Sequence, residues 1–272
     1  MSASRLTADR FPGIAEEIPN LEFTGERIIP GKTEEALFRE HEERYVFAGQ
    51  YVAGKDVLDV ACGTGIGTQY LRKAGAKNCI GLDIDGEAID YARAAYQECL
   101  FLQSDAVCLN LPDECVDVVV SFETIEHLAD QAGFLEECRR VLRAGGLLIC
   151  STPNRAISHW GERNPFHVHE LGVAEFRRLV ERKLGTAELY AQRMTLVPAH
   201  VYRFARTRIL EGLGIRRPLR AVKRWIRGEA PPLTFPKEFG EDLRARPAIG
   251  KFRFSPFSQP TYVIAVAVKR AS

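Results

Sequence analysis

The fold is decided by residues 57–67, Val-Leu-Asp-Val-Ala-Cys-Gly-Thr-Gly-Ile-Gly. The apolar residues at 57, 58 and 60 are typical of a buried parallel strand. Glycines at 63, 65 and 67 follow at once, and a helical pattern then runs through Leu71. Glycine allows a ligand to approach the backbone closely. The start of a helix offers backbone N–H groups that have no hydrogen-bond partner within the helix. The stretch therefore predicts a strand, a glycine turn and a helix that together bind a nucleotide.

Two details of this stretch disfavour a dinucleotide. The glycines follow the spacing G-x-G-x-G instead of G-x-G-x-x-G, and Asp59 lies inside the strand. A carboxylate repels a pyrophosphate but favours a cation such as S-adenosylmethionine, which carries a sulfonium and an ammonium group. The motif Asp-x-x-x-Gly-x-Gly resembles that of the class I S-adenosylmethionine-dependent methyltransferases. The alternative is a glycine turn in another α/β protein, because glycine motifs also arise by chance.

Strands and helices alternate along the rest of the chain. This alternation predicts an α/β fold with a doubly wound, mostly parallel, seven-stranded sheet. A helix within 34–52 leads into it. We expect strands near 56–61, 79–84, 100–104, 116–122, 146–152, 187–192 and 261–268, and helices near 66–74, 86–97, 130–143 and 173–184.

Composition suits one large domain with additions. The chain has 272 residues, 46% of them hydrophobic, and a net charge of +1, which provides no field to attract nucleic acid. Seven cysteines without a C-x-x-C pair disfavour structural zinc and favour a reducing compartment. No apolar signal core or run of 18 apolar residues is visible, so we expect a cytoplasmic protein. The expected divisions are an arm and lid helix (1–52), a methyltransferase core (53–192), a basic insertion (193–260) and a final strand with a tail (261–272).

Acidic residues follow the second and third strands, where ligands bind in open parallel sheets. Asp83 lies twenty residues after Gly63, and its carboxylate suits the two ribose hydroxyls. Asp85 is the competing candidate but better fits the N-cap of the next helix. The resemblance implies that Asp105 accepts a hydrogen bond from adenine and that Ala106 donates its N–H to the ring. The predicted cofactor residues are Asp59, Ala61, Gly63, Gly65, Asp83, Ile84, Asp105, Ala106 and Phe122.

The fourth strand is followed by Glu123, Glu126 and His127. His127 could be a general base for a substrate hydroxyl, because its ordinary pKa is about 6.5. Alternatively, all three could bind a divalent cation, since Glu-x-x-Glu-His is similar to the pattern of ubiquinone-pathway O-methyltransferases. A third possibility is structural, because acids in a first helical turn stabilise the helix dipole.

A loop near residues 164–171, Asn-Pro-Phe-His-Val-His-Glu-Leu, offers further candidates. We expect His167 to contact the substrate or to act as an auxiliary base, with loop packing as the alternative. His167 and His169 could also pair on a metal, but the spacing supplies no further ligand. The predicted catalytic residues are His127, Glu126, Glu123 and His167.

Several motifs together resemble bacterial methyltransferases of glycans, of the mycofactocin-oligosaccharide type. They are Thr24–Arg27, His41 with Arg44 and Tyr45, residues 121–127, residues 151–155 and residues 164–167. The resemblance implies a sugar hydroxyl as the methyl acceptor. Glu26, Arg27, His41, Arg44 and Tyr45 could close over the cofactor as a lid, or belong to a surface arm held by ion pairs.

Residues 203–228 are strongly basic, with nine Lys or Arg and one acid. Leu219, Val222 and Ile226 share a helical face beside Trp225, which suits peripheral contact with an anionic membrane. An anionic-substrate groove, a partner surface or a solvated face are the alternatives. The resemblance thus implies O-methylation of a hydroxyl group of a sugar, glycan or glycosylated metabolite. The alternatives are a metal-dependent methyltransferase of a quinol, phenol or lipid-like acceptor, a non-catalytic cofactor-binding protein and, opposed by Asp59, an NAD enzyme.

Overall fold

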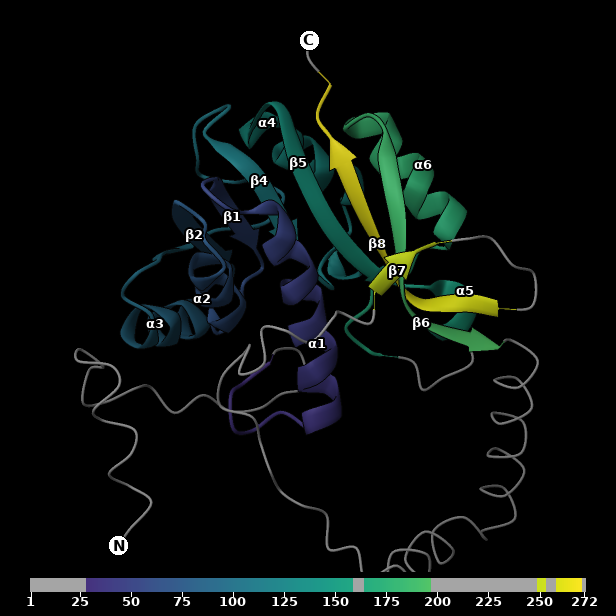
Figure 1. Cartoon of the computed structure of the whole chain (residues 1–272), viewed down its shortest axis with the longest axis horizontal. Helices are drawn as coiled ribbons and strands as arrows, with labels where there is room; N and C mark the ends of the chain where they lie inside the picture. Colours follow the sequence, from purple (N-terminus) through teal and green to yellow (C-terminus); the bar gives the residue numbers. More distant parts are fainter. Residues whose placement is uncertain (1–27, 159–163, 197–248, 253–257, 271–272) are drawn as a thin grey trace, which may run out of the picture.

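The computed structural model describes residues 28–158, 164–196, 249–252 and 258–270. In these parts of the chain one sheet contains the strands β1 (Asp56–Val60), β2 (Asn78–Asp83), β3 (Leu100–Gln103), β4 (Val116–Ser121), β5 (Leu142–Pro153), β6 (Ala187–Leu196), β7 (Ile249–Lys251) and β8 (Ser258–Val268). Their order is β3-β2-β1-β4-β5-β8-β6-β7 (Figure 1). The first five strands pair in parallel, and β8 enters antiparallel between β5 and β6. The predicted doubly wound, mostly parallel sheet is therefore confirmed.

The predicted helices are present to within a few residues. They are α1 (Glu35–Ala48), α2 (Ile66–Lys73), α3 (Gly86–Ala95), α4 (Gln131–Val141) and α6 (Val173–Lys183). The structure adds three short helices that were not predicted, η2 (Gly49–Tyr51), η3 (Ile125–His127) and α5 (Arg155–Ser158). Asp85 caps α3, because its side chain accepts from the backbone N–H groups of Glu87 and Ala88 at 2.8 and 3.3 Å. The N-cap predicted for Asp85 is confirmed.

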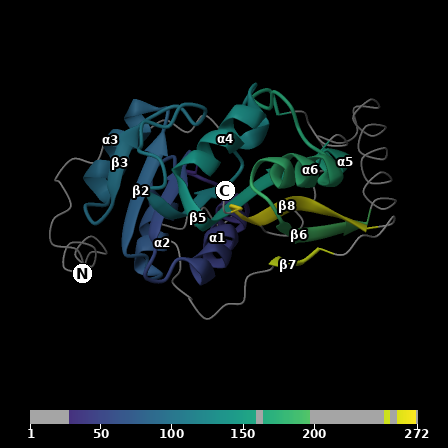
Figure 2. The same ribbon diagram turned by 90° about the horizontal axis from the view of Figure 1, so that it is seen from above.

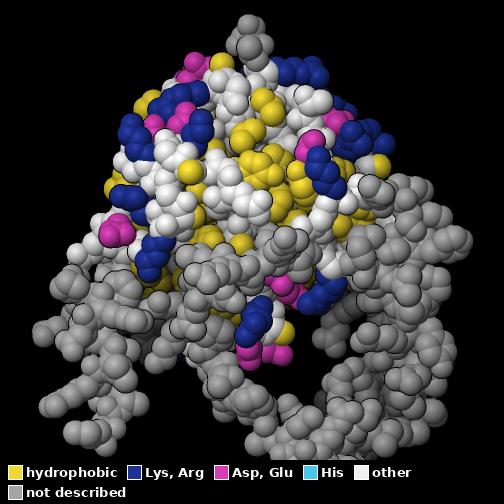
Figure 3. Space-filling model, in the orientation of Figure 1, with side chains coloured by type: hydrophobic (Ala, Val, Ile, Leu, Met, Phe, Trp, Pro, Cys, Tyr) yellow, Lys and Arg dark blue, Asp and Glu magenta, His cyan; other side chains and the backbone are white. Residues whose placement is uncertain are grey.

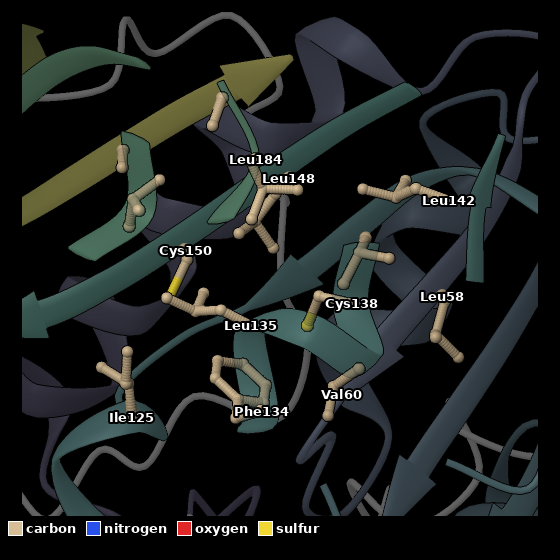
Figure 4. Close-up of a cluster of buried hydrophobic side chains, with 14 of the residues drawn as sticks. Leu58, Val60, Ile125, Phe134, Leu135, Cys138, Leu142, Leu148, Cys150 and Leu184 are labelled. Atoms are coloured by element: carbon tan, nitrogen blue, oxygen red, sulfur yellow. The ribbon is translucent and has the colours of Figure 1, made fainter. Parts of the chain in front are cut away.

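Both faces of the sheet are covered, and this explains the apolar strands. Helices α1 and α2 lie on one face, and α4 and α6 lie on the other (Figure 2). Val57 packs in the cluster with α1 and α2, whereas the next residue, Leu58, packs with α4 (Figure 4). Each fully buried side chain of this size contributes about 1.5–3 kcal/mol of burial free energy. Strands buried on both sides need no alternation of apolar and polar residues.

The predicted boundaries of the basic insertion differ from the observed elements. Residue 193 lies inside β6 and residue 260 lies inside β8, and β7 between them adds an eighth, edge strand. A three-residue strand is too short for a periodic pattern, so sequence reasoning did not predict it. The basic segment 203–228 and Thr24–Arg27 lie outside the described residues.

The surface seen in Figure 3 carries Lys, Arg, Asp and Glu side chains of both signs, interspersed with apolar ones. This mixture agrees with the near-zero net charge of the whole chain. None of the helices in the described parts has the length and hydropathy needed to cross a bilayer.

Candidate active site

A cavity of about 650 Å³ lies at the carboxyl ends of the parallel strands. Its walls come from the residues that follow β1, β2, β3, β4 and β5, together with α1 and β8. The strand order reverses between β1 and β4, and open α/β sheets bind ligands at such a switch point. The fold alone therefore places a ligand site here.

The predicted acid of the first strand, Asp59, lies beneath this cavity and is fully buried. Its Oδ2 accepts from the Thr68 hydroxyl at 2.7 Å, and both carboxyl oxygens lie 3.2 Å from the Tyr45 hydroxyl. Tyr45 lines the cavity, whereas Asp59 does not. The Tyr45 hydroxyl from α1 thus lies against the Asp59 carboxyl group, and the role of Asp59 towards a cationic ligand stays a prediction.

Burial also changes the protonation of Asp59. Desolvation raises the pKa of its carboxyl to about 7, although the Thr68 and Tyr45 hydrogen bonds oppose the shift and the Asp83 charge adds to it. A positive charge bound nearby would favour the ionised form. Asp59 therefore acts on the cavity through its charge and through Tyr45.

Gly67, the third glycine of the turn, makes room for that tyrosine. A Cβ atom at position 67 would lie 2.0 Å from Cζ of Tyr45. Gly65 has a different role, because its φ of +78° is strained for other residues and a Cβ there would also meet Ala92 and Phe101 at 2.7 Å. Gly65 and Gly67 therefore have a packing role. From the sequence alone, the glycines were explained by the close approach of a ligand to the backbone.

Replacing Gly67 with alanine is expected to lower the free energy of unfolding by about 1–3 kcal/mol or more, the typical cost of overpacking. Thermal or urea unfolding would measure the change. Gly250→Ala is the matched control, because a Cβ at position 250 meets nothing within 4 Å. Equal stability of the two variants would show that Tyr45 does not pack on the glycine turn as described.

Asp83 is brought to the cavity as predicted for a ribose-binding acid. Its Oδ2 accepts from the backbone N–H of Gly63 at 2.8 Å, and its Oδ1 accepts from that of Asp85 at 3.0 Å. These bonds fix the carboxylate against the glycine turn, at the edge of the cavity. Each oxygen has a second lone pair, which suits two neighbouring hydroxyl groups.

The remaining predicted cofactor residues, except Gly65, line the same cavity. Ile84 projects beside Asp83 and is 66% exposed, which offers an apolar surface to a flat ring. Asp105 is held by a bond from the Val107 N–H to its Oδ1 at 3.0 Å. The chain turns at Ala61, whose φ of +60° ends β1. Gly63, Ala106 and Phe122 also line the cavity, whereas Gly65 does not.

Glu123 lies at a sharp backbone turn, which directs its side chain away from Glu126 and His127. Its φ is +53°, a strained value for a residue other than glycine. Its Oε1 accepts from the Ser151 hydroxyl at 2.7 Å, and its Oε2 lies 3.9 Å from the buried Arg44 guanidinium. Glu123 therefore lines the cavity as an anchored carboxylate beside Arg44.

Glu126 is fully buried at the same end of the cavity. Desolvation, and then the charge of Glu123, raises the pKa of its carboxyl well above the usual range, so its neutral form is favoured. Its Oε2 accepts from Thr152 at 3.1 Å. Among the described residues, the buried side-chain polar atoms without a hydrogen-bond partner are Glu126 Oε1 and both terminal nitrogens of Arg44. Such atoms cost about 1–3 kcal/mol each unless a ligand or water satisfies them.

His127 and His167 meet edge to face, with ring centroids 4.9 Å apart. Nδ1 of His127 lies 3.1 Å from the Phe166 carbonyl oxygen, which can only accept, so Nδ1 carries a hydrogen and Nε2 is the accepting atom of the neutral ring. Both nitrogens of His167 are also engaged, by Glu170 Oε1 at 2.5 Å and by the Asn164 amide at 3.0 Å. The geometry thus suits His127 for proton acceptance and leaves His167 as a cavity contact.

These residues do not fit a metal centre in the predicted form. Glu123 is turned to Ser151 and Arg44, so it does not join Glu126 and His127. Glu126, His127 and His167 do come together, with one ligand atom of each within 4.8 Å of the others. However, both nitrogens of His167 already have partners, Glu170 and Asn164, so an ion bound there would have to displace one of them. A metal requires ionised carboxylates and available imidazole nitrogens.

The structure also adds residues that sequence reasoning assigned otherwise or missed. Arg44 and Tyr45 are buried between α1 and the sheet, so the surface-arm alternative is wrong for them. Arg44 donates to Gln192 Oε1 at 2.8 Å and lies over the Tyr262 ring. Tyr262 also lines the cavity. No local signal marks Gln192 or Tyr262, because each reaches the site through strand pairing far along the chain.

Comparisons with known proteins agree with this geometry. Residues 58–150 match the family model described as a methyltransferase domain. A probable S-adenosylmethionine-dependent methyltransferase of Mycolicibacterium smegmatis is 46% identical over 165 residues, which is 59% of this chain and 64% of that protein. A ubiquinone biosynthesis O-methyltransferase of Actinobacillus pleuropneumoniae is 34% identical over 145 residues, which is 47% of this chain and 60% of that protein. The matches span less than two thirds of these curated relatives.

Solved structures support the fold. A crystallised S-adenosylmethionine-dependent methyltransferase of Thermotoga maritima aligns with a TM-score of 0.57 and 15% identity, covering 86% of this chain and 92% of that one. At this identity the likeness concerns architecture alone. The sheet order and the structural likeness together show a Rossmann-like methyltransferase fold.

Proposed function

We propose that this chain, whose core has the class I S-adenosylmethionine-dependent methyltransferase fold, methylates a hydroxyl group of a sugar or glycosylated metabolite. The observation that carries the proposal is one cavity with Asp83 at one part of its wall and His127 at another. The first suits the ribose of the methyl donor, and the second suits the hydroxyl of an acceptor. S-adenosylmethionine, when bound, would supply a methyl group on a sulfonium, because the neutral thioether that remains is a good leaving group.

The protein residues need to perform only a few tasks in this reaction. Asp83 accepts from ribose hydroxyls, and Ile84 and Asp105 contact the adenine. His127 Nε2 accepts the proton of the acceptor hydroxyl as that oxygen attacks the methyl carbon, because an alcohol is scarcely ionised near neutrality. The partly apolar cavity holds the acceptor oxygen in line with the methyl group.

A hydroxyl-rich acceptor is favoured by the buried atoms without partners. Glu126 lines the cavity, whereas the fully buried Arg44 does not. The unpartnered Oε1 of Glu126 donates when it is protonated and accepts when it is ionised, and a hydroxyl group of the acceptor can match either form. The basic segment 203–228 could then guide an anionic or membrane-linked acceptor, which is the proposed role of the insertion.

Transfer of radiolabelled methyl groups into a panel of glycosides, lipid-linked sugars and quinols would test the proposal. We expect labelled glycosides and no labelled quinols. Calorimetry with S-adenosylmethionine and with NAD supplies the first step, because binding of NAD alone would overturn the proposal. Donor binding without transfer to any acceptor would favour a non-catalytic cofactor-binding protein.

Metal removal separates this function from the metal-dependent alternative. We expect methyl transfer to keep its full rate after dialysis against EDTA, because Glu123 is turned to Ser151 and Arg44 and both nitrogens of His167 already have partners. The rate should be compared before and after added Mg²⁺, with Na⁺ at equal ionic strength as the control. A large loss that Mg²⁺ restores would favour the quinol-type mechanism.

A further inference from the structure

The loop formed by residues 164–170 is tied closely to the strand end that carries His127. The backbone N–H groups of Val168 and His169 both donate to the Glu126 carbonyl, at 2.9 and 3.0 Å. The Gln131 amide donates to the His169 carbonyl and to the Ile125 carbonyl, both at 2.8 Å. The loop and η3 are therefore one hydrogen-bonded unit, although about forty residues separate them in sequence.

His167 is held from both sides within this loop. The Asn164 side-chain oxygen accepts from the Phe166 N–H at 3.0 Å, which directs the amide nitrogen towards Nε2 of His167 at 3.0 Å. An amide N–H can only donate, so Nε2 accepts and the ring hydrogen lies on Nδ1. That hydrogen is donated to Glu170 Oε1 at 2.5 Å. Glu170 in turn accepts from the Ser158 hydroxyl through its other oxygen.

These contacts lead to His127 through the Phe166 backbone, in addition to the edge-to-face contact of the two histidine rings. Phe166 lies between Asn164 and His167, and its carbonyl accepts from Nδ1 of His127 at 3.1 Å. The position of that carbonyl depends on the bonds that Asn164 and Glu170 make to the His167 ring. A fixed tautomer is what a general base of the proposed reaction requires, because the accepting nitrogen must face the substrate.

We propose that His167 is a positioning residue, which holds the 164–170 loop so that the Phe166 carbonyl keeps the ring hydrogen of His127 on Nδ1. Glu170 and Asn164 act through His167 in the same role. The catalytic meaning of this arrangement rests on the proposed methyl transfer. The tautomer itself is a property of the protein without donor or acceptor, and it can be measured separately.

Nitrogen-15 NMR of the histidine rings in the full chain tests this inference. At about pH 8, where imidazole is neutral, long-range proton–nitrogen correlations distinguish hydrogen on Nδ1 from hydrogen on Nε2. We expect His127, assigned from the signals lost in His127→Gln, to carry its hydrogen on Nδ1. In His167→Ala we expect this pattern to be lost and replaced by a mixture that includes the Nε2–H form.

His169→Ala is the matched control, because His169 lies in the same loop, its side chain is half-exposed, and among the described residues that side chain has only a 3.8 Å contact with Glu175. Its backbone bonds to Glu126 and Gln131 are kept in the variant. The His127 pattern should be unchanged in it. If His167→Ala does not fold by circular dichroism, Glu170→Ala serves instead, with the same expected loss. An Nε2–H tautomer in the unaltered protein, or an unchanged His127 pattern in the folded variant, would overturn the proposal.

Activity gives the second readout. In the same variant, kcat for the acceptor found in the labelling panel should fall at least about tenfold, while donor affinity stays unchanged. Failure to find an acceptor would count against the proposed function and not against the tautomer. Conversely, an altered tautomer with full kcat would show that the positioning role is irrelevant to the reaction and would refute it.

Discussion

Replacing His127 with alanine is expected to slow methyl transfer by about 10²–10⁴-fold, the usual contribution of a general base. In the neutral ring Nδ1 of His127 carries the hydrogen, which it donates to the Phe166 carbonyl. Nε2 is therefore the nitrogen that accepts the hydroxyl proton in the proposed reaction. Donor affinity should remain within about twofold, because the predicted ribose and adenine contacts lie after β2 and β3. Rates with the labelled donor and calorimetry would measure the two effects separately.

The control for this variant must alter a nearby imidazole without touching the reaction. His169→Ala meets that need and should keep the rate of the unaltered protein. Equal rates in His127→Ala and the unaltered protein would remove His127 from the mechanism. A loss of donor affinity as large as the loss of rate would instead indicate that His127 shapes the cavity.

Replacing Asp83 with alanine is expected to weaken binding of S-adenosylmethionine by about 10²-fold or more. Hydrogen bonds to a charged group contribute about 1.5–3 kcal/mol each, and two ribose hydroxyls would lose this partner. The variant also removes the carboxylate that fixes the Gly63 N–H, so the glycine turn itself would be less well ordered. Calorimetric titration with the donor measures the change directly.

Asp90→Ala supplies the comparison for Asp83. Asp90 is an exposed acid on α3 that pairs only loosely with Arg93, at 3.3 Å. Its removal changes the net charge equally but should leave the donor affinity within about twofold. If the two variants bound the donor equally well, the predicted ribose contact of Asp83 would be wrong.

Local patterns predicted the core of this fold well. The strand at Val57 and the cap at Asp85 follow from burial periodicity and side-chain hydrogen bonding over a few residues. Proximity in sequence was less informative at Glu123, Glu126 and His127, for which a shared metal was one of three alternatives. The left-handed φ of Glu123 turns that carboxylate to Ser151, and no spacing rule reveals such a turn.

Contacts between distant segments could not be predicted in the same way. Arg44 bonds Gln192 across 148 positions, and Tyr45 covers Asp59 from a helix that precedes the sheet. These pairings depend on the strand order and on how α1 crosses the sheet, and many arrangements suit the same apolar pattern. Their effect on the site is large, because they decide which charges reach the cavity.

The fit between Tyr45 and Gly67 has a consequence for protein engineering. The tyrosine belongs to a segment before the family match at 58–150, whereas the glycine lies inside it. A chimera that exchanged only the matched region with a relative would replace Gly67 but keep Tyr45, so the two residues would no longer come from the same protein. Transplantable modules of this fold therefore begin at the preceding helix, and both partners should be exchanged together.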